Sequence, residues 1–421
     1  MIDNFQFAQL VTTLSTNSIS TSKNKDFVNL YTKEGEEIDK IKSYFSKESL
    51  KELEVYVPIQ TRIRFDLNGI EKNIISCKRG LLEEVKEKLE RFKISMTLSN
   101  KDIYFKLKDY IPNLKSIFDY NSLKASQHDC AKLWLEKLRL EKEISDYENL
   151  VKFTDSDGFI SPQYNYYGSL SGRIISHSPS IQSIPKSFKD FLLPLKEEDL
   201  LFEVDITCAE LIALAFLTNE TKVFDLLENN KTIYRYVVEE VFKLNNEKFT
   251  DVHKQMMKRI VNGIFYGMGS SSIEAELKKV TNKNIKKGLG ENIKEKILNL
   301  FPNIKSYLIE IEKAKVLTTE YGHSFNVSPS YKNLYFPAQN LIATLLKEIL
   351  KDLADNKLLG NIINLVHDSI WVSCSKEDKD RIIKIFKRRV QTLLHEDYQD
   401  KGIDLVKIKH IGWVSNEFAE L

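Results

Sequence analysis

The chain has 421 residues, of which 42% are apolar, and its 62 basic and 60 acidic residues leave a formal net charge of +2. This composition supports a large core or several subdomains and excludes a histone-like polycation, so any nucleic-acid binding requires a local basic surface. No stretch approaches the roughly 20 apolar residues of a membrane span, the start lacks the basic segment of a signal peptide, and the four cysteines have neither CxxC nor zinc-ligand spacing. We therefore expect a cytoplasmic protein with reduced thiols and no membrane partner.

The N-terminal part of the chain changes character near residue 66. Residues 1–65 are polar and rich in Ser, Thr and Asn, and they predict no regular element. Helical spacing begins near Gly80, and a second amphipathic pattern covers about 131–144. The apolar positions of the first helix are Leu81, Leu82, Val85, Leu89 and Phe92.

The rest of the chain alternates strands with helical stretches. A turn at 155–158 precedes an aromatic and glycine-containing segment at 164–173. A strand ending at Asp205 follows, then mostly helical sequence to about Phe301, an irregular segment to about Ser330, and a strong helix from about Pro337. A strand hairpin at 362–374 comes next. This order predicts an α+β fold, with a small antiparallel sheet and helical insertions.

Two aspartates each follow a short apolar run that is typical of a buried strand. Asp205 follows the apolar-rich run 200–204, and Asp368 follows 362–366 and His367. Two strand-end carboxylates can hold two Mg²⁺ ions side by side, which is the core of metal-assisted nucleotidyl transfer. Either segment alone is equally compatible with an ordinary strand end, because strands commonly end in turns that contain Asp.

One predicted helix carries cations and an aromatic ring on a single face. Lys254, Lys258, Asn262 and Tyr266 recur every four residues. Two ammonium groups one turn apart suit a triphosphate, and an aromatic ring suits a base or a sugar. A surface helix rich in lysine explains the same pattern equally well, although Gly263 and Gly267 would each cost a helix interior about 1 kcal/mol. Glycine there makes sense if a ligand or another helix approaches closely.

Four blocks in this order resemble family A DNA polymerases. S-G-R-I-I-S-H-S-P-S-I-Q-S-I-P at 171–185 resembles T-G-R-L-S-S-x-x-P-N-L-Q-N-I-P, and D-I-T-C-A-E-L from Asp205 resembles D-Y-S-Q-I-E-L. Residues 254–268 resemble R-x-x-x-K-x-x-x-F-G-x-x-Y-G-M, and 367–369 resemble H-D-E. Lesser matches lie at 337–339 and 231–242. The resemblance covers about 160–421 well and 66–160 weakly.

The resemblance implies a right-hand polymerase fold. Residues 66–160 would form a thumb-like helical region, 161–225 the first part of the palm, and 226–330 the fingers with the lysine helix. Residues 331–421 would complete the palm, and 1–65 remain a short region of unclear role. The five lysines at 278–287 are expected to face solvent in the fingers.

The resemblance also implies a role for each matching residue. Asp205, Asp368 and the backbone carbonyl of Ile206 would bind two Mg²⁺ ions, for which Mn²⁺ can substitute. Lys258 would contact the triphosphate and protonate the leaving pyrophosphate. Lys254 stands where the family has arginine, and it would neutralise a phosphate without the bidentate fork.

Other matching positions would select the nucleotide and hold the DNA. Glu210 would pack under the sugar and exclude a 2′-hydroxyl, and Tyr266 would close the pocket at the templating position. Arg173 would read the primer-terminal pair from the minor groove. The same primer–template surface would include Gln182, Gln339 and His367.

Two departures from the family pattern concern the site itself. Asn262 replaces the aromatic residue that abuts the nucleotide sugar, and Ser369 replaces the Glu after the second aspartate. H-D-S, together with Lys258-Arg259, resembles the phage type of RNA polymerase, whereas Glu210 and the Arg173 block favour DNA synthesis. We therefore keep a ribonucleotide-tolerant or RNA-synthesising polymerase or primase as an alternative, and a catalytically silent DNA-binding subunit as another.

The combined prediction is a magnesium-dependent DNA polymerase without proofreading. About 65 residues precede the thumb-like region, which is too short for an exonuclease domain of ordinary size, and the single D-x-E, at 146–148, is expected to be a surface pair. Its partners would be primer–template DNA and deoxynucleoside triphosphates (dNTPs), and the protein is expected to be a monomer. A processivity partner, a replication or repair role, and a phage or mobile-element origin are left open by the sequence.

Overall fold

The computed structural model describes residues 60–166, 168–169, 171–243, 250–281, 286, 288–314, 316–319, 324–326 and 334–412. The predicted N-terminal region 1–65 lies outside the described residues except for 60–65. The chain divides into two compact units. Of the described residues, 60, 164–177 and 202–409 belong to the larger unit, and 61–163, 178–201 and 410–412 belong to the smaller unit.

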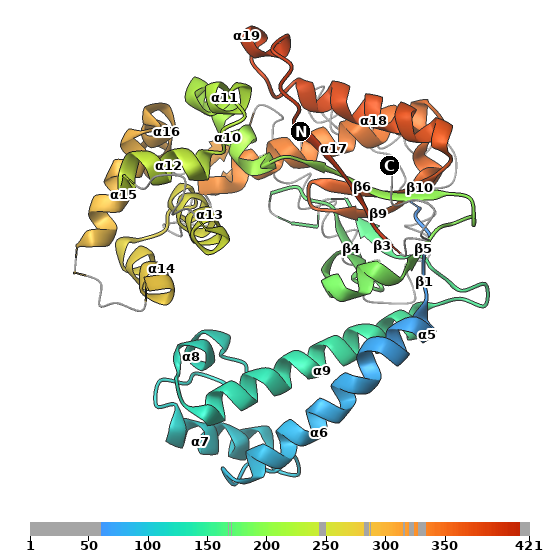
Figure 1. The fold of residues 1–421 in the computed structure, drawn as a ribbon, viewed down its shortest axis with the longest axis vertical. Helices are drawn as coiled ribbons and strands as arrows, with labels where there is room; N and C mark the ends of the chain where they lie inside the picture. The colour runs from blue at the N-terminus through green and yellow to red at the C-terminus, as the bar shows by residue number, and fades with distance from the viewer. Residues whose placement is uncertain are drawn as a thin grey trace, which may run out of the picture. The chain divides into compact units, whose positions relative to one another are not determined.

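Two long helices form the centre of the smaller unit. Helices α6 (Ser76–Glu90) and α9 (Asp129–Phe153) lie side by side, and α7 (Asn100–Tyr110) and α8 (Tyr120–Ala125) pack at one end of the pair (Figure 1). The π-helical turn Glu71–Ile75 continues α5 (Leu67–Ile70) into α6. Strand β1 (Ile63–Phe65) pairs antiparallel with β2 (Phe159–Ile160) and with β5 (Leu192–Leu193). Trp134 is buried in this unit, and its indole N–H donates to the carbonyl of Ile117 at 2.7 Å.

Both predicted helices of this unit are present, but they are longer than predicted. Helix α6 starts at Ser76 rather than near Gly80, and α9 extends from Asp129 to Phe153 rather than over 131–144. Leu82, Val85 and Leu89 are buried, whereas Leu81 is 40% exposed. Leu81 was wrongly placed on the buried face, because neighbouring residues in a helix point about 100° apart and Leu82 takes the inward position.

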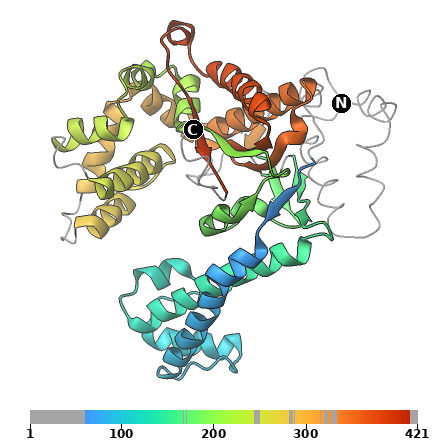
Figure 2. The same ribbon diagram turned by 45° about the vertical axis from the view of Figure 1, so that its right-hand side comes forward.

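A four-stranded sheet organises the larger unit. Its strand order is β11 (Val406–His410), β6 (Leu200–Ile206), β10 (Ser369–Cys374) and β9 (Ile362–Val366), and β9 and β10 form an antiparallel hairpin. Helices α17 (Phe336–Asp355) and α18 (Lys376–Gln391) pack together beside this sheet (Figures 1 and 2). The predicted strands before both aspartates are confirmed, as is the predicted helix near Pro337.

Helices fill the sequence between the two halves of this sheet. They are α10 (Ala209–Thr218), α11 (Thr221–Glu228), α12 (Ile233–Phe242), α13 (Asp251–Phe265), α14 (Ser270–Thr281), α15 (Leu289–Asn299) and α16 (Pro302–Lys313). Short hairpins are formed by β3 (Gln163–Asn165) with β4 (Ile175–His177), and by β7 (Val316–Thr318) with β8 (Ser324–Asn326). The predicted α+β class is confirmed.

The segment after Phe301 was wrongly predicted to be irregular. Pro302 occupies the first turn of α16, where its missing N–H costs nothing. Ile304, Leu308 and Ile311 are buried at helical spacing on one face. After α16, residues 316–318 and 324–326 form the antiparallel strand pair β7–β8.

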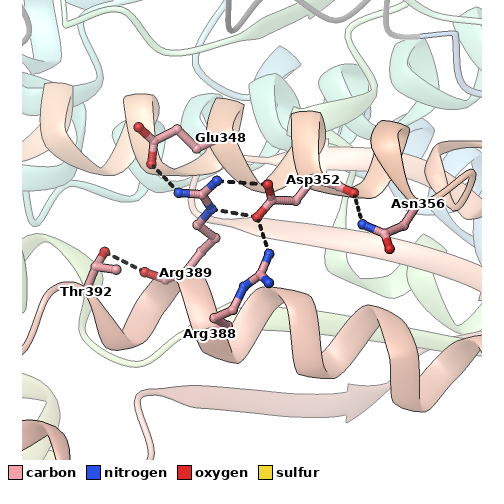
Figure 3. A network of polar contacts seen from close by, with 6 residues as sticks. All are labelled: Glu348, Asp352, Asn356, Arg388, Arg389 and Thr392. Carbon is pink, nitrogen blue, oxygen red and sulfur yellow. Dashed lines mark hydrogen bonds and ion pairs between the residues drawn. The ribbon is translucent and has the colours of Figure 1, made fainter.

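An ion-pair network joins α17 to α18 (Figure 3). The guanidinium of Arg389 donates to both carboxylate oxygens of Asp352, from Nε at 2.6 Å and from an Nη atom at 2.8 Å. Arg388 donates to the same carboxylate at 3.1 Å, and Glu348 lies 3.6 Å from Arg389. The hydrogen bond from Arg389 is the main reason that the pKa of Asp352 is lowered. Because Asp352 is only 8% exposed, the bidentate pair fixes the register of the two helices.

Helix α19 (Glu396–Gln399) lies between α18 and β11 in the sequence. None of the described helices is both long enough and apolar enough to cross a membrane.

Candidate active site

The two aspartates meet at one edge of the four-stranded sheet. Asp205 is the second-last residue of β6, and Asp368 completes the two-residue turn between β9 and β10. His367 supplies the first turn position with φ of 55°, the positive value that tight hairpin turns require. The backbone N–H of Ile206 donates to the carbonyl of Asp368 at 3.4 Å, which holds the two strand ends next to each other. Strand pairing therefore brings both predicted carboxylates together.

Burial and the neighbouring carboxylate change the acidity of Asp368. Burial, and secondly the charge of Asp205, raise the pKa of Asp368 to about 6. A carboxylate that is disfavoured in this way gains more than an isolated one from a nearby cation. Among the described residues no cluster of three or more His, Cys, Asp or Glu side chains is placed to hold a metal. The protein donors available at this edge are thus two carboxylates and backbone carbonyls, hard oxygen ligands that suit Mg²⁺ when the substrate supplies the rest.

Two charged residues next to Asp205 were missed from the sequence. Lys409 on β11 donates to Asp205 Oδ2 at 2.9 Å and lies 3.7 Å from a carboxylate oxygen of Glu203. Glu203 is only 8% exposed and accepts hydrogen bonds from Ser369 Oγ at 3.0 Å and Trp371 Nε1 at 3.1 Å. Burial lowers the pKa of Lys409, but the hydrogen bond and charge of Asp205 outweigh it, so the pKa lies above its usual value.

The sequence alone contains a feature that points to Glu203. It is a carboxylate inside an apolar run, two positions before Asp205, and therefore on the same face of the strand. A charge inside a buried strand requires a partner. The partner, Lys409, could not be identified without the strand order, because it lies on a strand that is about 200 residues away.

A second cluster surrounds Glu210 in the first turn of α10. The carboxylate accepts hydrogen bonds from the Arg173 guanidinium, the Tyr266 hydroxyl and the amide of Gln339, the last at 3.0 Å. The backbone N–H of Arg173 donates to Ser169 Oγ at 2.9 Å, which fixes the loop that carries the guanidinium. Four residues that the sequence predicted for the site are thus brought together from distant segments.

His367 and Arg173 both lie near the aspartates. Burial is the main reason that the pKa of His367 is lowered, and the charge of Arg173 adds to it, so His367 is neutral near pH 7. The Nε atom of Arg173 is buried and has no hydrogen-bond partner among the described residues. An unsatisfied buried donor costs free energy unless a ligand or water completes it.

The predicted lysine helix is confirmed as α13. Lys254 and Lys258 are exposed on it, and neither side chain forms a hydrogen bond or an ion pair with another described residue. Asn262 accepts a hydrogen bond from the buried Tyr234 at 3.2 Å. The ring of Tyr266 stacks on the buried ring of Tyr335, with centroids 3.4 Å apart.

Of the two glycines of this segment, Gly263 lies in the last turn of the helix and Gly267 follows its end. Gly267 has φ of 85°, and its N–H donates to Ile264 while that of Met268 donates to Gly263. This is the usual glycine-dependent helix C-terminus. A Cβ at Gly263 would lie 2.3 Å from the Met268 side chain. Packing against Met268 therefore explains Gly263, and the positive φ explains Gly267, whereas the sequence had predicted a ligand or another helix as the close neighbour.

The remaining predictions fall elsewhere in the chain. Gln182 lies in the short 3₁₀ helix Ile181–Ser183 of the smaller unit, whereas the other predicted site residues belong to the larger unit. Of the predicted solvent-facing lysine run, Lys278, Lys279 and Lys286 are exposed. Lys283 and Lys287 lie outside the described residues.

A family model described as DNA polymerase family A matches residues 70–325. The chain belongs to this family. DNA polymerase I of Aquifex aeolicus (strain VF5) is 25% identical over 271 residues, which cover 62% of this chain and 47% of that protein. DNA polymerase I of Bacillus subtilis (strain 168) is 23% identical over 289 residues, which cover 62% of this chain and 32% of that protein. This family A chain thus spans half or less of the curated relatives it matches.

A solved structure gives the same assignment of the fold. The POL domain of Pol1 from M. smegmatis, in complex with DNA primer-template and dNTP, matches with a TM-score of 0.70 at 16% identity. The match covers 83% of this family A chain and 66% of that chain. The family A polymerase fold predicted from the sequence is therefore confirmed. The family-model match begins at residue 70, so it also includes the region where the sequence resemblance was weak.

Proposed function

We propose that the chain is a DNA-directed DNA polymerase that adds deoxynucleotides to a primer 3′ end and releases pyrophosphate. The observation that carries the proposal is the meeting of Asp205 and Asp368 at one sheet edge, with Glu210 and its three donors in the same unit. Family membership and the polymerase fold support the same reaction.

The proposed metal site consists of Asp205, Asp368 and the carbonyl of Ile206, which would hold two Mg²⁺ or Mn²⁺ ions. The donor chemistry fits, because these are hard oxygen ligands and because the pKa of Asp368 is raised, first by burial and then by the charge of Asp205. When bound, such ions lower the pKa of the primer 3′-hydroxyl and neutralise phosphate charge.

The exposed lysines of α13 are proposed to act on the triphosphate. Lys254 and Lys258 are one turn apart and are not ion-paired with other described residues, so both ammonium groups are available to an anion. We assign the proton donation to the leaving pyrophosphate to Lys258. Lys254 neutralises phosphate as a point charge, without the two parallel hydrogen bonds of an arginine.

Glu210 is proposed to select the deoxyribose. Its carboxylate is fixed by Arg173, Tyr266 and Gln339, so it cannot easily move away from a 2′-hydroxyl. Tyr266 is proposed to close the nucleotide pocket through its stack on Tyr335. Arg173 is proposed to contact the primer terminus through its unsatisfied Nε atom. The proposed primer–template contacts also include Gln182, Gln339 and His367.

A ribonucleotide-tolerant polymerase is the second candidate, and Asn262 is the observation that favours it. Asn262 is smaller than the aromatic side chain of the family pattern, and its carbonyl oxygen is engaged by Tyr234. The three hydrogen bonds on Glu210 favour DNA synthesis over this candidate. A catalytically silent subunit is disfavoured because Asp205, Asp368 and Lys258 are all present.

We further propose that this polymerase does not proofread and acts as a cytoplasmic monomer on primer–template DNA. Asp146, the first residue of the D-x-E motif, forms an ion pair with Lys142 along the surface of α9 at 2.7 Å, as expected for a solvated helix pair. The four cysteines are free, which suits a reducing compartment. Removal of a mismatched 3′ nucleotide in the absence of dNTPs would contradict the lack of proofreading. Sedimentation measures whether the protein is a monomer.

Primer extension tests the central proposal. Purified protein should extend a primed DNA template with Mg²⁺ and dNTPs, and Asp205→Asn and Asp368→Asn should each abolish extension while DNA binding survives. Asp355→Asn, which changes an exposed aspartate of α17, is the matched control and should extend normally. Extension at the wild-type rate by either site variant would refute the assignment. Parallel reactions with ribonucleotides distinguish the second candidate.

A further inference from the structure

The carboxylate of Asp205 forms an ion pair with a lysine of the same chain. Lys409 Nζ lies 2.9 Å from Asp205 Oδ2, and this is the hydrogen-bonded partner of Asp205 among the described residues. Lys409 comes from β11, the neighbour of β6 in the sheet, so its backbone is fixed beside the strand that carries Asp205. A divalent ion on Asp205 would have to share that carboxylate with an ammonium group or displace it.

Glu203 is a second carboxylate within reach of the same ammonium group. Its Oε1 atom accepts from both Ser369 and Trp371, at 3.0 and 3.1 Å, and its Oε2 atom lies 3.7 Å from Lys409 Nζ. One oxygen therefore anchors the side chain, and the other is presented to Lys409. Glu203 is only 8% exposed, and a buried carboxylate is costly unless it has charged or hydrogen-bonding partners.

Ser369 is the position at which this chain lacks the carboxylate of the family pattern. The family pattern has Glu at this position, directly after the second aspartate. In this chain Ser369 is buried and its hydroxyl donates to Glu203 on the neighbouring strand. The carboxylate that is missing from β10 is thus supplied by β6, at a place where it can reach Lys409.

We propose that Lys409 is a positioning residue that occupies the Asp205 carboxylate before a metal ion binds and moves to Glu203 when it does. This proposal rests on the proposed metal site. In the metal-free protein one ammonium group offsets the charges of Glu203 and Asp205. When a divalent cation binds the Asp205 carboxylate, it repels the Lys409 ammonium group. The ammonium group then pairs with Glu203 instead, for which the 3.7 Å between Lys409 Nζ and Glu203 Oε2 must shorten. Glu203 thereby lowers the free energy needed to break the ion pair between Lys409 and Asp205.

Direct Mn²⁺ binding tests the proposal without relying on catalysis. Free Mn²⁺ is measured by electron paramagnetic resonance during titration of the full chain, without DNA or nucleotide. Lys409→Met removes the competing cation and should tighten the Asp205-dependent binding by about three- to tenfold. Glu203→Gln removes the acceptor for the displaced ammonium group and should weaken binding by a similar factor. The two variants are therefore expected to shift affinity in opposite directions.

Two further variants serve as controls. Lys384→Met removes an exposed lysine of α18 that forms no ion pair with Asp205 or Glu203, and it should change affinity less than about twofold, because an exposed charge outside this cluster is screened by salt. Lys409→Arg keeps the positive charge and should restore an affinity close to that of the wild type. Circular dichroism melts establish that each variant is folded.

The outcomes separate this proposal from the proposed function. If the wild type shows no Mn²⁺ binding that Asp205→Asn removes, the metal site itself is wrong and this proposal fails with it. If that binding is present but Lys409→Met leaves it unchanged or weaker, only the role of Lys409 is overturned. The Mg²⁺ concentration for half-maximal primer extension should fall in Lys409→Met as affinity rises.

Discussion

Asp368 makes the metal-free protein less stable as the pH rises. Its pKa is about 6 in the folded protein, against an ordinary value of 3.8, first because of burial and then because of the charge of Asp205. Between these two pH values the folded state holds a proton that the unfolded state has lost. Stability contributed by this proton is complete below about pH 4 and is lost as the pH rises through 6. The shift corresponds to about 3 kcal/mol.

Urea denaturation in the presence of a chelator measures this effect. The free energy of unfolding of the wild type, minus that of Asp368→Asn, should fall by about 2.4 kcal/mol between pH 4 and 7, because the amide does not titrate and part of the full shift is already lost at pH 4. Saturating Mg²⁺ at pH 7 should restore much of the loss by binding the ionised pair. Asp355→Asn is the control for a change of one exposed charge. A difference that stays constant or increases with pH would refute the electrostatic account of the site.

Three other substitutions have definite expected outcomes. Glu210→Ala should lower the preference for deoxynucleotides over ribonucleotides by at least about tenfold in single-nucleotide extension, and an unchanged preference would exclude Glu210 as the sugar filter. Arg389→Leu leaves the Asp352 carboxylate without its bidentate partner and should lower the free energy of unfolding in urea by about 2 kcal/mol. This is less than for a fully buried pair, because the arginine side chain is 33% exposed. A loss under about 0.5 kcal/mol would show that the pair is not stabilising. Leu89→Ala removes a fully buried side chain of α6 and should cost about 3 kcal/mol while the KM for dNTPs stays constant, whereas a changed KM would show coupling to the nucleotide site.

The sequence predicted the aspartate pair because its signal is local. The apolar runs before Asp205 and Asp368 identify two strands, and carboxylates at strand ends can meet when the strands pair. The Glu210 cluster was predicted only through the family resemblance. Its members come from four distant segments, and neither spacing nor periodicity relates them.

Lys409 and Gly267 show why other features were missed or misread. Lys409 acquires its role from the adjacency of β11 and β6, a pairing that depends on the whole sheet. Gly267 was taken to be inside a helix, where glycine is costly, but the helix ends at Phe265 and the glycine supplies the positive φ of its terminus. A helix boundary wrong by two residues was enough to make a residue of the helix terminus look like a ligand contact.

The hydrogen bond from Trp371 to Glu203 gives the sheet an intrinsic optical reporter. The indole N–H donates to a carboxylate two positions from Asp205, so a change of charge at this edge alters the electric field on the indole and therefore its emission. Trp134 lies in the other unit, and Trp413 is outside the described residues. A variant that retains only Trp371 would therefore follow events at the four-stranded sheet without any added dye.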